Sequence, residues 1–394
     1  MMLNFKAVYI VFIYTTFFFI VIPLLLFVSS NGDEYHIHLA LIAFISVVSL
    51  FIGYKIPAYF PRVKIDKLLI KPSFVFYTIA ASFMIFMLYS FYTFKGVPLF
   101  MLLSGQGGAD ELRGGLFKGR QGLEILLLYF SAIFTYVFLP LAILVSFKFE
   151  LRFRWFFLLL SLLFCVSTLQ KALLLNLLIP IFVYFIYSEK IKVKHAIIIL
   201  AFLFAYFIGM IVFTGHGESN HAIYNSFDFK TFFSSGFSPN GGVEYFLWRI
   251  IAVPVYTAVD TLYVFENYLK GEYLFGGTSS MFSFLLGVPK VELEKIVFAY
   301  QFGNYSQLAN ANATFSVALF VDFSYIGVIV FSTLLGGGFR LFERSDDLIM
   351  ISVGYLMAFK VLNAPLIGLF FSSGFLYFLF HVIFLRVKGV GFAK

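Results

Sequence analysis

Long apolar runs separated by short polar connections make up almost the whole chain. An apolar run of about 18 or more residues is long enough to cross a bilayer as a helix. We therefore predict an all-α polytopic integral membrane protein, a single membrane domain over residues 1–394 with about ten transmembrane helices and at most twelve. The predicted helices cover residues 8–28, 37–54, 74–92, 123–147, 155–169, 172–187, 196–213, 312–336, 348–362 and 366–386.

One apolar segment does not fit this series. Residues 246–265, FLWRIIAVPVYTAVDTLYVF, are apolar enough to cross, yet they contain Arg249, Pro254 and Asp260. Ionisable groups at membrane depth are tolerated where they face a cavity or other protein. A crossing here would also move every later loop to the opposite side. We interpret the segment as a buried, re-entrant or interfacial helix within one large outer loop, residues 214–311.

The Lys and Arg residues indicate which side of the membrane each loop faces. Most of the 28 lie in the loops that share a side with both termini, and far fewer lie in the loops at 93–122 and 214–311. Cytoplasmic loops carry an excess of Lys and Arg. We therefore expect both termini to be cytoplasmic and these two loops to be periplasmic, in a bacterial inner membrane.

Composition supports the membrane assignment and excludes several functions. The chain is 61% hydrophobic and only 12% charged, whereas about a quarter of residues are charged in soluble domains. The net charge of +8 does not indicate nucleic-acid binding, because the cations are spread over short loops. The single cysteine, Cys165, lies in an apolar segment, so we expect no disulfide framework and no thiolate metal site.

A glycine-rich loop on the predicted outer side carries three cations. It reads RGGLFKGRQG, residues 113–122. Glycine lets a backbone approach a ligand closely, and Arg113 and Arg120 match phosphate oxygens in a bidentate geometry. The loop is a candidate site for a lipid-linked phosphate or pyrophosphate. The alternative is a solvated loop whose cations contact headgroups or the nearby Asp110 and Glu111.

Three further cations lie on or near the same side. Arg249 stands in an apolar context, where a buried arginine needs an anion, either a substrate phosphate or Glu244. Lys171 stands at a tight turn between two short helices, where it would bind pyrophosphate or anchor the turn at the membrane interface. Lys360 lies near the outer end of its helix, where we expect its side chain to extend to the interface.

The candidate catalytic groups are two residues of the large outer loop and one carboxylate within a helix. His216 or Glu218 would act as general base on a sugar hydroxyl. These two and His221 lack the ligand set of a zinc site, so we predict no metal. Asp322 lies inside an otherwise apolar helix, where a carboxylate is either functional or fixes helix packing through a hydrogen bond or ion pair.

The segment 310–337, NANATFSVALFVDFSYIGVIVFSTLLGG, resembles the late helix of O-antigen polymerases, the Wzy-type oligosaccharide repeat-unit polymerases. Thr314, Asp322, Phe323 and Gly327 carry the resemblance. The helix number, the arginines on the outer loops and the absence of a soluble domain agree with it. The chain also has no Walker motif, GxSxG motif or dinucleotide fingerprint, so the donor is expected to be activated by a lipid phosphate.

The resemblance implies a membrane-embedded glycosyltransferase of the C class, independent of metal and cofactor. Such an enzyme transfers a growing glycan from undecaprenyl pyrophosphate to a lipid-linked repeat unit, in contact with membrane lipid and with a polysaccharide chain-length regulator as candidate partner. Arg113, Arg120 and Arg249 would then hold the pyrophosphate as it leaves. Arg249 lies in an apolar segment, which departs from the paired glycine-rich loops expected of the family.

Three other functions compete with this reading. An O-antigen ligase would use the same donor with a lipid A core acceptor, and sequence separates it poorly from a polymerase. A lipid-linked oligosaccharide flippase usually has about twelve or more helices and short outer loops, which the long loop 214–311 disfavours. An accessory membrane protein would leave the outer arginines unexplained.

Overall fold

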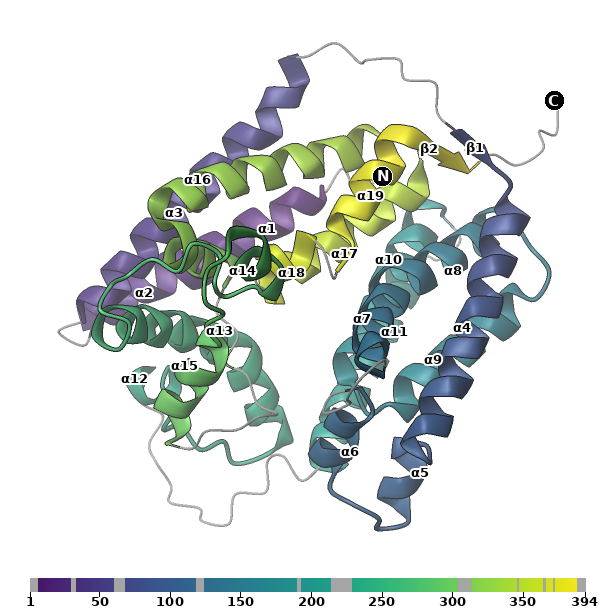
Figure 1. The fold of residues 1–394 in the computed structure, drawn as a ribbon, viewed down its shortest axis with the longest axis horizontal. Coiled ribbons are helices and arrows are strands. Elements are labelled where there is room, and N and C mark those ends of the chain that lie inside the picture. Colours follow the sequence, from purple (N-terminus) through teal and green to yellow (C-terminus); the bar gives the residue numbers. More distant parts are fainter. Residues whose placement is uncertain are drawn as a thin grey trace.

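The computed structural model describes residues 6–29, 33–59, 68–117, 124–189, 193–213, 229–303, 311, 314–345, 347–363, 366–370 and 373–387, and this part of the chain is almost entirely helical (Figure 1). The helices up to residue 213 are α1 (Ala7–Thr16), α2 (Ile22–Ser29), α3 (Glu34–Tyr59), α4 (Pro72–Phe94), α5 (Pro98–Leu103), α6 (Ala109–Gly115), α7 (Ile125–Ile133), α8 (Leu139–Lys148), α9 (Arg154–Ser167), α10 (Lys171–Tyr187) and α11 (Val193–Phe213). The later helices are α12 (Phe229–Phe232), α13 (Gly242–Asn267), α14 (Ser280–Leu286), α15 (Leu293–Phe302), α16 (Phe315–Arg344), α17 (Leu348–Asn363), α18 (Leu366–Phe370) and α19 (Phe375–Phe384). Two π-helical turns, η1 (Phe17–Val21) and η3 (Phe134–Phe138), and two short strands, β1 (Leu68–Ile70) and β2 (Leu385–Val387), complete the fold.

Six helical runs in the described part of the chain are long and apolar enough to cross a membrane, by length and composition. They are Ala7–Ser29, Glu34–Ile56, Pro72–Leu103, Phe130–Lys148, Gly242–Asn267 and Phe315–Arg344, and shorter apolar helices accompany them. Large apolar side chains such as Ile85 and Leu88 are exposed on α4, as expected of a surface that faces lipid. The fold class is that of an all-α, multi-pass membrane protein, and the number of crossings stays a prediction.

The helices form two bundles joined at one end (Figure 1). The first bundle contains α1–α3, α13, α15 and α16, and the second contains α4–α11. Helix α17 contacts α1 and α16 on one side and α8 and α10 on the other, while α11 also contacts α13. The strand pair lies toward the joined end, and α5, α6 and α15 lie toward the opposite end.

Close packing of α3 against α16 organises the first bundle. A Cβ atom at Gly53 would lie 1.9 Å from a backbone oxygen of α16, and one at Gly336 would lie 2.1 Å from a backbone oxygen of α3. The hydroxyls of Ser46 and Ser332 are 3.0 Å apart across the same contact. Small residues allow helix backbones to approach where lipid offers no hydrophobic driving force, so these glycines determine the crossing.

A polar cluster ties three helices of this bundle together near the joined end. Tyr54 donates its hydroxyl hydrogen to Glu343 and accepts hydrogen bonds from Lys6 and Arg340, each at 3.0 Å. The hydrogen bond to Tyr54 raises the pKa of Lys6, which therefore stays charged. The four side chains come from α3, from α16 and from Lys6, which directly precedes α1, so the cluster holds these helix ends in register.

Three predicted helices differ from the structure. The predicted helix 8–28 is divided into α1, η1 and α2. The predicted helix 123–147 is divided into α7, η3 and α8. The predicted helix 366–386 is wrong as a single element, because it comprises α18, α19 and strand β2. Gly374, with a positive φ of 84°, precedes α19, and β2 pairs in parallel with β1. Local hydropathy does not report a strand pair between segments so far apart in sequence.

The apolar segment at 246–265 belongs to a longer helix than the sequence indicated. Residues 246–265 form the middle of α13, a continuous helix of 26 residues that contains Pro254. Its length and composition would also allow it to cross a membrane. Its place in an outer loop, and the outer loops at 93–122 and 214–311, therefore stay predictions.

Candidate functional site

A cavity of about 200 Å³ lies within the second bundle. Its polar lining comes from three separate segments: Arg113 on α6, Ser131 and Thr135 with Tyr136 around the α7–η3 junction, and Gln170 before α10. The lining thus combines one guanidinium, three hydroxyls and one amide. Thr135 donates its hydroxyl hydrogen to the carbonyl of Ser131 at 2.6 Å. A guanidinium and an amide donate hydrogen bonds to anionic oxygen, so the cavity has the chemistry of an anion site.

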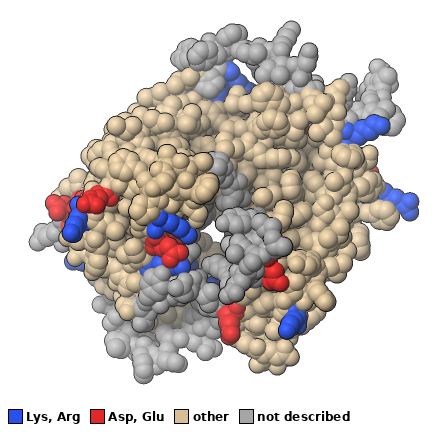
Figure 2. Space-filling model, viewed as in Figure 1, with Lys and Arg blue, Asp and Glu red and all other residues tan. Residues whose placement is uncertain are grey.

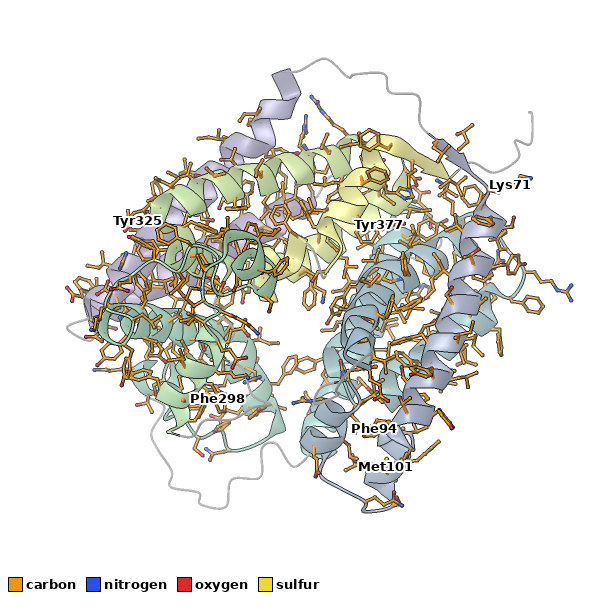
Figure 3. The ribbon with its side chains drawn as sticks, viewed as in Figure 1. Lys71, Phe94, Met101, Phe298, Tyr325 and Tyr377 are labelled. Atoms are coloured by element: carbon orange, nitrogen blue, oxygen red, sulfur yellow. The ribbon has the colours of Figure 1, made fainter. Side chains whose placement is uncertain are left out.

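Helix α6 presents Arg113 from its last turn. A cation is favourable there, because the carbonyl end of a helix carries partial negative charge. Gly114 lines the cavity, whereas a Cβ atom on Gly115 would lie 3.2 Å from the ring of Phe94 at the end of α4 (Figure 3). Gly114 therefore borders the cavity, whereas Gly115 allows α6 to approach the ring of Phe94.

The π-helical turn η3 follows from a proline. Pro140 has no backbone N–H, and its ring clashes with the carbonyl of the residue four positions earlier, which is Tyr136. The helix widens here, and the backbone N–H of Leu139 donates a hydrogen bond to the carbonyl of Phe134, five residues earlier. Such π turns often occur at functional sites. Here the turn presents Tyr136 to the cavity, and Pro140 within an apolar run was the available sequence signal.

Lys360 contacts the same tyrosine. Its ammonium nitrogen lies 3.4 Å from the centre of the Tyr136 ring, and the residue is only 8% exposed. The prediction that Lys360 extends to the membrane interface is therefore wrong. The ammonium is buried against an aromatic face, which attracts cations electrostatically.

Arg249 lies apart from this cavity. It is exposed on α13 of the first bundle, so the expectation that it is buried is wrong. Among the described residues it forms no ion pair with Glu244, whose carboxylate accepts the backbone N–H of Asn240 at 2.5 Å. Figure 2 shows that the face of the molecule seen in Figure 1 is hollowed near its centre, with charged side chains around the hollow. Arg113 and Arg249 belong to different bundles and do not share the cavity.

Asp322 is fully buried and hydrogen-bonded within the protein. Its carboxylate accepts the hydroxyl of Thr278 at 2.5 Å and the backbone N–H of Thr278 at 3.3 Å. Helix α16 is interrupted directly after it, at Phe323 and at Ser324, which has a φ of 60°. The carboxylate thus fastens the segment before α14 to the break in the helix.

The same break is closed by backbone hydrogen bonds. Leu274 donates its N–H to the carbonyl of Val321 at 3.1 Å, and Phe275 donates to the carbonyl of Asp322 at 2.8 Å. An interrupted helix leaves carbonyls without partners, and these must be satisfied at membrane depth. The contacts correspond to the packing role predicted as one of the two alternatives for Asp322.

Several predicted site residues cannot be placed. Arg120, His216, Glu218 and His221 lie outside the described residues. Lys171 begins α10, next to the cavity-lining Gln170, but its side chain lies outside the described part as well. Within the residues that are described, no group of three His, Cys, Asp or Glu side chains could hold a metal ion.

Comparison of the chain with protein-family models, curated proteins and solved structures finds no match.

Proposed function

We propose that this protein is an O-antigen polymerase of the bacterial inner membrane. It transfers a growing glycan from undecaprenyl pyrophosphate to the terminal sugar of a lipid-linked repeat unit, on the periplasmic side, with both termini in the cytoplasm. The observation that carries the proposal is the cavity lined by Arg113, three hydroxyls and Gln170. It supplies a cation and neutral donors within an apolar bundle, as a lipid-linked pyrophosphate requires.

The proposed reaction breaks the bond between the anomeric carbon and the pyrophosphate oxygen. The hydroxyl of the acceptor sugar attacks that carbon, its proton passes to a base, and undecaprenyl pyrophosphate leaves with the bonding electrons. Negative charge grows on the leaving oxygen, and a fixed cation such as Arg113 stabilises it without reorganisation. His216 and Glu218 are the favoured bases, since the carboxylate of Asp322 is already engaged by Thr278.

One observation favours a second candidate, the flippase. The break in α16 lies within a helix long enough to cross a membrane, and discontinuous helices form substrate sites in transporters. In those sites the freed carbonyls coordinate the transported solute or ion. Here Leu274 and Phe275 occupy two of those carbonyls, so the break offers less to a solute than the cavity offers to a pyrophosphate.

Deletion of the gene, followed by gel analysis of surface polysaccharide, tests the proposal. Loss of a polymerase leaves lipid A core with a single repeat unit. Loss of a ligase leaves unattached polymer on the lipid carrier, and loss of a flippase leaves neither polymer nor a single attached unit. Either of the last two patterns, or an unchanged ladder, would overturn the proposal.

Metal independence is tested on the purified protein. We expect polymer synthesis from lipid-linked repeat units to continue in excess EDTA, because the proposed leaving group is stabilised by side-chain cations. A strict requirement for added divalent cation would contradict this part of the proposal.

A further inference from the structure

Lys360 is a buried amine that the proposed reaction does not yet use. Its ammonium contacts the ring of Tyr136, and no carboxylate in the described part of the chain forms an ion pair with it. Burying a cation without an anion is costly, and an aromatic face offsets only part of that cost. An anion close to Tyr136 would offset that cost and hold Lys360 in its protonated form.

The cavity is the place where such an anion can lie. Tyr136 lines it together with Arg113, and the ammonium of Lys360 contacts the ring of that same tyrosine. The two cations come from α17 and α6, which are far apart in sequence. Electrostatic attraction needs no direct contact, and solvent screens the buried Lys360 less than the exposed Arg113. An anion in the cavity would therefore interact with both cations.

We propose that Lys360 is the second cation of the pyrophosphate site, acting across the ring of Tyr136. The inference rests on the proposed function and assigns a residue to its leaving group. Arg113 contacts the phosphate oxygens, while Lys360 is a positioning residue that supplies charge without touching them. Two cations suit a diphosphate, which carries more negative charge than a monophosphate, so the site discriminates between the two.

The test compares Lys360→Met and Lys360→Arg in the purified full-length protein. Binding of inorganic pyrophosphate and of inorganic phosphate is measured by the ligand-dependent rise in unfolding temperature. We expect Lys360→Met to weaken pyrophosphate binding about tenfold or more, as for loss of one charged interaction, and to affect phosphate less. Lys360→Arg keeps the charge and retains binding. Lys290→Met, at an exposed lysine paired with Glu292, is the matched control.

Stability without ligand separates this role from a structural one. If Lys360 awaits an anion, its replacement by Met removes an uncompensated charge, and the ligand-free unfolding temperature stays the same or rises. A marked fall would assign Lys360 to packing and overturn the inference. Tyr136→Phe keeps the ring and should preserve binding more fully than Tyr136→Leu.

The outcomes also separate this inference from the proposed function. A normal ladder in cells with unchanged pyrophosphate binding in Lys360→Met overturns the inference alone. Lost binding in that variant, together with a gene deletion that leaves the polysaccharide unchanged, supports the site and overturns the polymerase. Absence of pyrophosphate binding by the unmodified protein overturns the inference directly.

Discussion

Asp322 and Lys360 are both buried ionisable groups beside an interrupted helix, and the protein surrounds them differently. Asp322 accepts two hydrogen bonds from Thr278, and neighbouring amides close the break in α16. Lys360 has the ring of Tyr136 and, in the described part of the chain, no carboxylate. A buried charge whose hydrogen-bond partners belong to the protein stabilises the fold. A buried cation without a carboxylate partner instead favours binding of an anionic ligand. Loss of Asp322 should therefore affect stability first, and loss of a cation at the cavity should affect ligand binding first.

We expect the largest effect from replacing Asp322. Asp322→Ala leaves the donors of Thr278 without an acceptor in a buried site, and should lower the free energy of unfolding by about 2–4 kcal/mol. Chemical denaturation of the protein in detergent measures this loss. Thr278→Val, which removes one of the same hydrogen bonds, should cost about 1 kcal/mol.

The conservative variant Asp322→Asn is the sharper control. An amide oxygen can still accept from Thr278, so we expect a folded protein that retains much of its activity. A fully stable Asp322→Asn protein without polymer synthesis would make Asp322 the general base, and the contrast with Lys360 would fail.

We expect the next largest effect from replacing Arg113. Arg113→Ala should reduce polymer synthesis about 100-fold, as for removal of one donor to a developing oxyanion, while the unfolding temperature changes little. The readouts are the length of the polysaccharide ladder and the amount of protein in the membrane. A full-length ladder at normal protein levels would exclude Arg113 from the site.

A smaller effect is expected from Pro140→Ala. Restoring the backbone N–H allows a regular α-helix in place of η3, which should raise stability because an interior proline costs up to about 3 kcal/mol. The same change moves Tyr136, so pyrophosphate binding should weaken. Lower stability together with unchanged binding would show that the π turn has no role in positioning Tyr136.

The smallest effect is expected from Arg249→Ala. Arg249 is exposed and lies outside the cavity, and exposed charged contacts contribute about 0–1 kcal/mol. The ladder should shorten without being lost. A ladder abolished as completely as in Arg113→Ala would place both arginines on one substrate, with the hollow between the bundles as its path.

The membrane character and most helix positions could be predicted from hydropathy, because each crossing helix must be apolar along its own length. The interruptions were predicted less well. Pro140 marks η3 in the sequence, but nothing local marks the break after Asp322, where Ser324 adopts a positive φ. That break depends on hydrogen bonds from a segment more than 40 residues earlier.

The candidate site could likewise be predicted only in part. The sequence indicated that Arg113 was chemically notable, because a cation on an outer loop is unexpected. It grouped Arg113 with Arg249, which the structure places in the other bundle, and it treated Lys360 as an interfacial anchor. The residue type and the predicted side of the membrane identify candidate site residues. They do not indicate which side chains lie close together in the fold.

The sequence by itself determined that the chain is an α-helical membrane protein with few ionisable groups within its helices. Exposing polar groups to lipid is unfavourable, so each segment that crosses must itself be apolar. Only the tertiary structure decided what surrounds each of those groups. Asp322 accepts hydrogen bonds from Thr278, which is distant in sequence, and Lys360 contacts an aromatic ring beside a cavity lined by Arg113. The energy of a buried charge depends on neighbours contributed by other helices, and their order along the chain does not specify them.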